Sequence, residues 1–241
     1  MVDFYVFQDA AGVSMAAAEL MLERAQQAVE EHGRFVLALS GGSTPGLLFE
    51  LLAEEPFRDV FPWEKTFVFW GDDRAVGPEH EWSNYLMAHK KLLSVVPVPE
   101  SQVFRIQGEL GAVRATEVMS ADLESVFGTD GIPRFDFLLQ GIGGDGHTAS
   151  LFPGTDALDA QGWVAPVIAP PANPAVDRVT LTFPVLNAAR LALFLVVGQG
   201  KKDVFNEILS DPEAGSRYPA ARVESEETLW FVDEAALGVL S

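Results

Sequence analysis

The chain has 241 residues, a formal net charge of −19 and no cysteine. Its length suits a single globular domain over residues 1–241, and the lack of cysteine excludes disulfides, thiolate nucleophiles and cysteine metal sites. Its 16 Lys and Arg residues are spread along the chain, so we expect no nucleic-acid partner, and without a long apolar run or a secretory-signal pattern we expect a cytoplasmic protein with no membrane partner.

The apolar spacing predicts helices that alternate with strands. Met15, Ala18, Leu22, Ala25 and Val29 mark one face of a helix that ends near His32, with Gly33 as its C-cap. The other expected elements are strands 3–7, 34–39, 66–70, 135–139, 178–183, 191–197 and 229–232, helices 45–54, 83–95, 112–127 and 201–209, and a short terminal helix. Such alternation is typical of an α/β protein with a parallel or mostly parallel sheet covered on both faces. We expect the proline-rich stretch 166–174 to be an ordered extended loop.

Ligands of open α/β sheets bind beyond the carboxyl ends of the strands, so the residues after each strand are the candidates for a binding site. The segment Ser40-Gly41-Gly42-Ser43-Thr44-Pro45 follows the strand 34–39. Its glycines permit close backbone approach, Ser43 and Thr44 offer hydroxyls, and a helix follows at once. This chemistry predicts a phosphate cradle. The alternative is a tight turn in which Ser43 or Thr44 merely caps the helix.

Two carboxylates and a guanidinium, Asp72, Asp73 and Arg74, follow the next strand. Their position after a buried strand favours a functional site, and a surface turn with a local ion pair is the alternative. Basic groups beside later strands, Arg178 and Lys201, stand out in so acidic a chain. We predict that Arg74, Arg178 and Lys201 together form an anion pocket.

The segment 141–154, GIGGDGHTASLFPG, satisfies G-x-G-x-x-G, yet a dinucleotide site also needs a following helix and an acidic residue about 20 positions on. Pro153 and Gly154 argue against that helix. The loop offers Asp145 and His147 instead, an acid and a general base, although helix capping by Asp145 or Thr148 would also explain it. The other histidines, His32, His80 and His89, are expected to be solvated, so no metal site is expected.

Three segments together resemble the 6-phosphogluconolactonase family: Leu39 to Pro45, Asp72-Asp73-Arg74 with Ser83-Asn84-Tyr85, and Gly143 to Gly154. The resemblance extends over nearly the whole chain. The family usually has Asp-Glu-Arg where this chain has Asp72-Asp73-Arg74, and Val-Pro-Pro where it has Val76-Gly77-Pro78. The first loop is shared with the related glucosamine-6-phosphate deaminases, which lack the T-A-S-L-F stretch.

The resemblance implies a three-layer α/β/α sandwich with a mostly parallel, Rossmann-like sheet of the deaminase/isomerase type. It further implies hydrolysis of 6-phosphogluconolactone to 6-phosphogluconate in the oxidative pentose phosphate pathway, without metal or organic cofactor. The expected partner is a small sugar phosphate, and the protein is expected to be a monomer or weak dimer. A deaminase and a non-catalytic sugar-phosphate binding protein are the alternatives.

Lactone hydrolysis requires a base, stabilisation of an oxyanion and a proton for the leaving ring oxygen. We predict that His147 is the base and later the acid, oriented by Asp145 or by Asp72, and that glycine-loop amides receive the oxyanion. The predicted phosphate ligands are Gly42, Ser43, Thr44, Arg74, Arg178 and Lys201.

Overall fold

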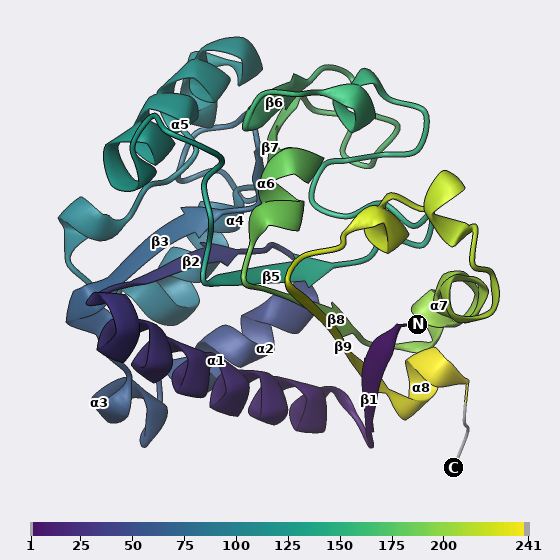
Figure 1. Cartoon of the computed structure of the whole chain (residues 1–241), viewed down its shortest axis with the longest axis horizontal. Coiled ribbons are helices and arrows are strands. Elements are labelled where there is room, and N and C mark those ends of the chain that lie inside the picture. The colour runs from purple at the N-terminus through teal and green to yellow at the C-terminus, as the bar shows by residue number, and fades with distance from the viewer. Residues whose placement is uncertain (1, 239–241) are drawn as a thin grey trace.

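In the computed structural model, which describes residues 2–238, six parallel strands form the main sheet (Figure 1). Across the sheet they run in the order β1 (Asp3–Phe7), β9 (Glu227–Asp233), β8 (Leu191–Val196), β5 (Phe137–Gly141), β2 (Phe35–Leu39) and β3 (Thr66–Trp70). The strands β2 and β8 are buried along their whole length. Their unbroken apolar sequences follow from this, because neither face of a central parallel strand meets water.

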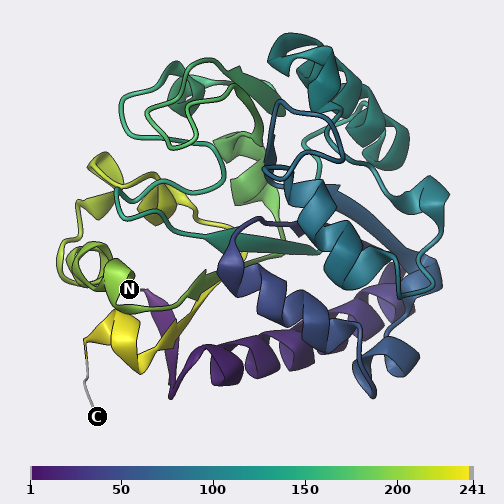
Figure 2. The same ribbon diagram turned by 180° about the vertical axis from the view of Figure 1, so that it is seen from behind.

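Helices cover both faces of this sheet, which confirms the predicted fold class. They are α1 (Ala10–His32), α2 (Ser43–Leu52), α3 (Phe57–Val60), α4 (Asn84–Ala88), α5 (Ala112–Phe127), α6 (Phe183–Ala188), α7 (Lys202–Ser210) and α8 (Glu234–Leu237). In Figures 1 and 2, α1 and α2 lie on one side of the sheet and α5 on the other. Short 3-10 turns at 63–65, 100–102, 108–110, 156–159, 199–201, 214–216 and 219–222 lie among these elements.

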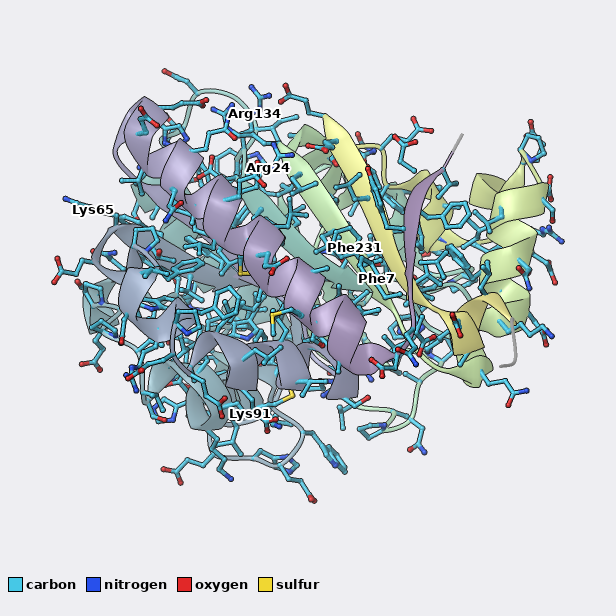
Figure 3. The ribbon with its side chains drawn as sticks, turned by 90° about the horizontal axis from the view of Figure 1, so that it is seen from below. Phe7, Arg24, Lys65, Lys91, Arg134 and Phe231 are labelled. Atoms are coloured by element: carbon cyan, nitrogen blue, oxygen red, sulfur yellow. The ribbon has the colours of Figure 1, made fainter. Side chains whose placement is uncertain are left out.

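The first helix, α1, crosses the strands obliquely in Figure 3, where Arg24 and Arg134 lie near the amino ends of β8 and β9. Asp9 caps the start of α1 by accepting from the Gly12 amide at 2.9 Å, and Gly33 ends it in the left-handed conformation as predicted. The predicted buried face is partly wrong, because Met15 is exposed. The residues that pack inward are mostly small, which lets the helix approach the sheet closely: Val13, Ala17, Ala18, Met21, Ala25 and Ala28.

A second, antiparallel sheet was not predicted. It consists of β4 (Asp72–Arg74), β7 (Arg178–Leu181) and β6 (Val164–Val167), and α5 packs against β6 and β7. The predicted strand 178–183 therefore belongs to this sheet and stops at Leu181, since Pro184 favours the first turn of α6. The expected loop 166–174 begins as part of β6.

Helix boundaries also differ from the predictions near the sheet's carboxyl edge, by which we mean the side at which its parallel strands end. The helix expected over 83–95 is a short α4 that continues as a π-helical turn, His89–Leu93. The helix expected from Pro45 begins two residues earlier, at Ser43, directly behind Gly42. Within residues 2–238, no helix is both long and apolar enough to span a membrane.

Candidate active site

A pocket of about 180 Å³ opens at the carboxyl edge of the main sheet. Its lining combines residues from the loops after β2 and β5 with residues of the second sheet and α4: Ser40, Gly41, Gly42, Asp72, Arg74, Asn84, Gly141, Ile142, His147, Ala149 and Arg178. A larger hollow of about 450 Å³ lies beside β1 and β9, but no Arg, Lys or His belongs to its lining among the described residues. The smaller pocket brings together predicted site residues from the segments that follow β2, β3 and β5.

The loop between β2 and α2 presents a helix N-terminus to this pocket. Gly42 is the N-cap of α2, with φ of 104°, and no side chain caps the helix. The alternative of a Ser or Thr cap is therefore wrong: Ser43 and Thr44 lie inside the first turn. The unpaired amides of a first helical turn carry a partial positive charge and attract anions, so the backbone of this loop is suited to a phosphate group.

Two arginines face one another across the second sheet. In the β4–β7 register, Arg74 is the direct partner of Arg178. Directly opposed like charges destabilise a strand pair, and Arg178 is also only 5% exposed. Burial lowers the pKa of Arg178 below its ordinary value; Asp72 opposes this shift and Arg74 adds to it. Within residues 2–238 the Nε atom of each arginine is buried without an acceptor, so this pair suits an anion.

Asp73 supports the backbone beside the pocket and does not line it. Its carboxylate accepts from the amides of Arg74 and Asn84, both at 2.7 Å, from the Tyr85 amide at 3.1 Å and from the Ser83 hydroxyl at 3.2 Å. Burial raises the pKa of Asp73 to about 6, although these backbone hydrogen bonds work in the opposite direction. The predicted alternative of a surface turn is wrong here, because Asp72 and Asp73 are both buried.

The two departures from the family pattern fall at Asp73 and at Gly77. Asp73 holds the start of α4 against β4. Gly77 has open space around the position of an added Cβ. Neither residue belongs to the pocket lining.

The imidazole of His147 contacts the carboxylate of Asp145 and packs against the ring of Phe152. Asp145 Oδ1 lies 2.6 Å from His147 Nδ1 and also accepts from the His147 amide at 3.2 Å. Burial by itself would raise the pKa of Asp145, but the hydrogen bond and the charge of His147 lower it overall. The His147 and Phe152 ring centroids are 4.4 Å apart. With Nδ1 engaged, the imidazole keeps Nε2 as the atom that can exchange a proton with a ligand.

Glycines permit this loop geometry. A Cβ at Gly143 would lie 2.1 Å from His147 Nδ1 and 2.4 Å from Asp145 Oδ1. Gly146 has φ of 78°, and a Cβ there would lie 2.3 Å from the Tyr218 ring. No helix follows the loop before Pro153. The helix-capping alternative for this loop is therefore wrong, and the expected absence of a dinucleotide-type helix is confirmed.

Of the two carboxylates predicted to orient His147, Asp145 is the one in contact with its ring. Asp145 touches the imidazole, whereas Asp72 Oδ2 accepts from the Ser150 hydroxyl at 2.5 Å. Asp72 remains part of the pocket lining, beside Arg178. Ala149, which lies between His147 and Ser150 in the sequence, has φ of 46°, a strained value for a residue with a side chain.

Lys201 does not line the pocket. It lies in the 3-10 turn Gln199–Lys201, where the Gly200 carbonyl oxygen is 4.0 Å from a Cβ built on Gly144. This turn therefore adjoins the His147 loop, and the role of Lys201 in anion binding stays a prediction.

Sequence reasoning missed Asn84 and Phe152 as parts of the site. Asn84 lines the pocket. Phe152 contacts both His147 and Arg178, whose Cζ lies 5.4 Å from the ring centroid. Both residues belong to segments that the sequence singled out, but the sequence offered no sign that an amide or a phenyl ring would contact the charged groups. Among the residues described, no group of three or more His, Asp or Glu could hold a metal ion.

The fold and this pocket define an α/β protein with a basic, histidine-containing site at the carboxyl edge of a parallel sheet. Residues 8–230 match the family described as glucosamine-6-phosphate isomerases/6-phosphogluconolactonase, and the chain belongs to that family. It is 39% identical to a 6-phosphogluconolactonase from Homo sapiens, over 98% of this chain and 93% of the human protein.

Solved structures agree. The crystal structure of 6-phosphogluconolactonase from Thermotoga maritima superposes with a TM-score of 0.84 and 31% identity, over 97% of this chain and 100% of that one. A monomeric glucosamine-6-phosphate deaminase has the same fold, with a TM-score of 0.80 over 99% of this chain and 100% of that one. At 18% identity, that similarity concerns the fold alone.

Proposed function

We propose that this chain is an enzyme that hydrolyses 6-phosphogluconolactone to 6-phosphogluconate, the lactonase step of the pentose phosphate pathway. Support comes from the full-length similarity to proteins of that name. One observation carries the assignment at the level of the site: His147, which Asp145 contacts, lines the same pocket as the opposed Arg74 and Arg178. A base and an anion-binding group are the two components that a phosphorylated lactone requires.

In the proposed mechanism, His147 Nε2 removes a proton from the attacking water. Asp145 accepts a hydrogen bond from Nδ1–H, which fixes the tautomer and stabilises the imidazolium that forms. Water adds to the lactone carbonyl carbon, giving a tetrahedral oxyanion that the amides of the glycine-rich loop 141–146 receive. The carbon bond to the ring oxygen then breaks, and the imidazolium returns its proton to that oxygen. Water is consumed and no other reactant is required.

The phosphate is proposed to bind the first-turn amides of α2, at Ser43 and Thr44 behind Gly42, together with Arg74 and Arg178. Guanidinium groups bind phosphate oxygens with two parallel hydrogen bonds. Anchoring the phosphate far from the reacting carbon fixes the lactone carbonyl against His147. Lys201 is proposed as a further cation at the rim. Asp72 is proposed to keep Arg178 charged through its nearby carboxylate, while its contact with Ser150 fixes the loop that follows His147.

The proposed reaction is tested by generating 6-phosphogluconolactone in solution and following its disappearance above the spontaneous rate. In parallel, ammonia release from glucosamine 6-phosphate is measured. Lactone hydrolysis without ammonia release is the expected result. Ammonia release alone would identify a deaminase. Saturable binding of 6-phosphogluconate with neither reaction would identify a non-catalytic binding protein.

We also propose that residues 1–241 act as one catalytic domain, since the family match extends over most of the chain. A cytoplasmic location and a monomeric or weakly dimeric state stay predictions. Light scattering at several protein concentrations tests the second of these.

A further inference from the structure

The side chain of Asn84 contacts three residues that line the pocket: Asp72, Arg74 and Gly41. Asn84 is the first residue of α4 and is only 3% exposed. Its Nδ2 donates to the carbonyl oxygen of Asp72 at 2.9 Å, and its Oδ1 accepts from Arg74 Nη1 at 3.1 Å. Both ends of the amide are therefore engaged with β4, and the side chain is fixed in one orientation.

The same amide lies against the phosphate-binding loop. A Cβ built on Gly41 would be 2.0 Å from Asn84 Oδ1, 2.4 Å from Cγ and 2.7 Å from Nδ2. Distances this short show that the backbone of Gly41 rests directly on the face of the amide. Asn84 therefore sets the separation between the N-terminus of α2 and the strand β4.

Arg74 depends on such a contact for its orientation. Its strand partner is Arg178, so charge repulsion pushes the two guanidinium groups apart. Two acceptors hold Arg74 Nη1 in place: the Trp82 carbonyl oxygen at 2.6 Å and Asn84 Oδ1. Asn84 also packs against Gly41, in the loop before α2.

The backbone of Asn84 is itself anchored. Asp73 Oδ1 accepts from the Asn84 amide, and the Ser83 hydroxyl caps α4 by accepting from the Leu86 amide at 3.2 Å. The start of α4 is thus built as a rigid support from which one amide side chain reaches the pocket.

We propose that Asn84 is a positioning residue that orients Arg74 and holds the Gly41 loop at the distance that a phosphate group requires. The proposal rests on the proposed function, in which these two groups bind the substrate phosphate. Asn84 acts through Arg74 and the loop backbone, so its loss affects affinity more than turnover.

A double-mutant cycle tests this role, with 6-phosphogluconate as the probe and calorimetry as the measurement. We expect Asn84→Ala to weaken binding about tenfold, and Arg74→Gln about tenfold or more. Because Asn84 acts in part through Arg74, the double variant should bind more tightly than the product of the two single losses predicts. Multiplied effects in the double variant, or unchanged binding by Asn84→Ala, would overturn the proposal.

Ser83→Ala is the matched control, since it disturbs the same helix start and has no contact with Arg74 or Gly41. We expect it to lower Tm while affinity and KM stay unchanged, whereas Asn84→Ala raises KM and keeps kcat within about threefold. Equal losses of affinity in both variants would show that helix stability, and not the amide, is responsible. A wild-type protein that neither binds 6-phosphogluconate nor hydrolyses the lactone would overturn the proposed function as well.

Discussion

The main sheet has an amino edge, at which its parallel strands begin, and a carboxyl edge, at which they end. The two edges carry similar side chains in different arrangements. At the amino edge, Asp136 accepts from the Val36 amide at 2.8 Å, contacts His32 Nε2 at 3.0 Å and forms an ion pair with Arg190, whose Nε lies 3.1 Å away. His32 lies exposed at the end of α1, as its sequence position predicts, and its ring also contacts this carboxylate. At the carboxyl edge, Arg74 and Arg178 face one another instead.

The amino edge is neutralised by contacts within the chain. Arg24 pairs with Glu227 at 2.7 Å and Arg134 pairs with Glu226; Figure 3 shows these arginines at that edge. The Asp136 carboxylate is buried and already contacts the Val36 amide, His32 and Arg190, so few of its lone pairs remain for a ligand. Residue type alone therefore does not identify a site: histidine, aspartate and arginine occur at both edges, and the opposed Arg74 and Arg178 lie at the carboxyl edge.

The largest expected effect separates the two histidines. His147→Ala should lower kcat by about 10²- to 10⁴-fold, since it removes the general base, and leave KM nearly unchanged. His32→Ala should leave both constants unchanged. Steady-state lactone hydrolysis of the two variants decides this, and equal turnover by His147→Ala and wild type would remove His147 from the mechanism.

The second-largest effect should distinguish Arg178, at the carboxyl edge, from Arg190, at the amino edge. Arg178→Gln should weaken 6-phosphogluconate binding by about 10- to 100-fold, the value of a charge-assisted hydrogen bond of about 1.5–3 kcal/mol. Arg190→Gln, at the amino edge, is the matched variant and should leave this affinity unchanged. Calorimetric titration of both variants tests the contrast. It would fail if Arg190→Gln proved as damaging as Arg178→Gln.

Removing Asp136 should affect stability and not function. Asp136→Ala leaves the Val36 amide without its acceptor and Arg190 without its ion-pair partner, so the free energy of unfolding should fall by about 1–3 kcal/mol. Urea denaturation measures the change, and lactonase assays under folding conditions should show wild-type KM. A raised KM with unchanged stability would place Asp136 in a ligand site.

Asp73 lies at the carboxyl edge, yet its role is to anchor the backbone amides of Arg74, Asn84 and Tyr85. Its pKa is raised by burial from 3.8 to about 6 in the folded protein, so folding favours the protonated form. Its stabilising contribution is therefore complete below pH 3.8 and is lost as the pH rises through 6. A shift of this size corresponds to about 2–3 kcal/mol at most.

Asp73→Asn tests that sign. The variant should lose the part of the pH dependence that belongs to Asp73, so wild-type stability should fall relative to the variant between about pH 4 and pH 6. Chemical denaturation at several pH values measures the difference. Parallel stability curves for the two proteins would show that Asp73 does not titrate in this range.

Strong local signals made part of this structure predictable from the sequence. The buried strands β2 and β8 follow from continuous apolar runs, and the end of α1 follows from Gly33. The glycine-rich segment around His147 similarly indicated a loop with an acid and a base. In each case the residues that define the feature are neighbours along the chain.

Features that depend on distant pairings escaped prediction. The strand β4 has three charged residues and no apolar pattern, so its pairing of Asp72 with Thr180 leaves no local trace. Asp72 and Asp73 are chemically identical in sequence, and only alternation along β4 sends one to the pocket and the other to the helix start. The roles of Asn84 and Phe152 arise from the same long-range packing.

The most direct test of the contrast between the edges is a titration of isotope-labelled protein with 6-phosphogluconate, followed through backbone amide NMR signals. The predicted result is a set of saturable shifts at the carboxyl edge, centred on Gly41, Ser43 and Ala149. Shifts centred on Val36 and Arg190, with the carboxyl edge unaffected, would contradict the account.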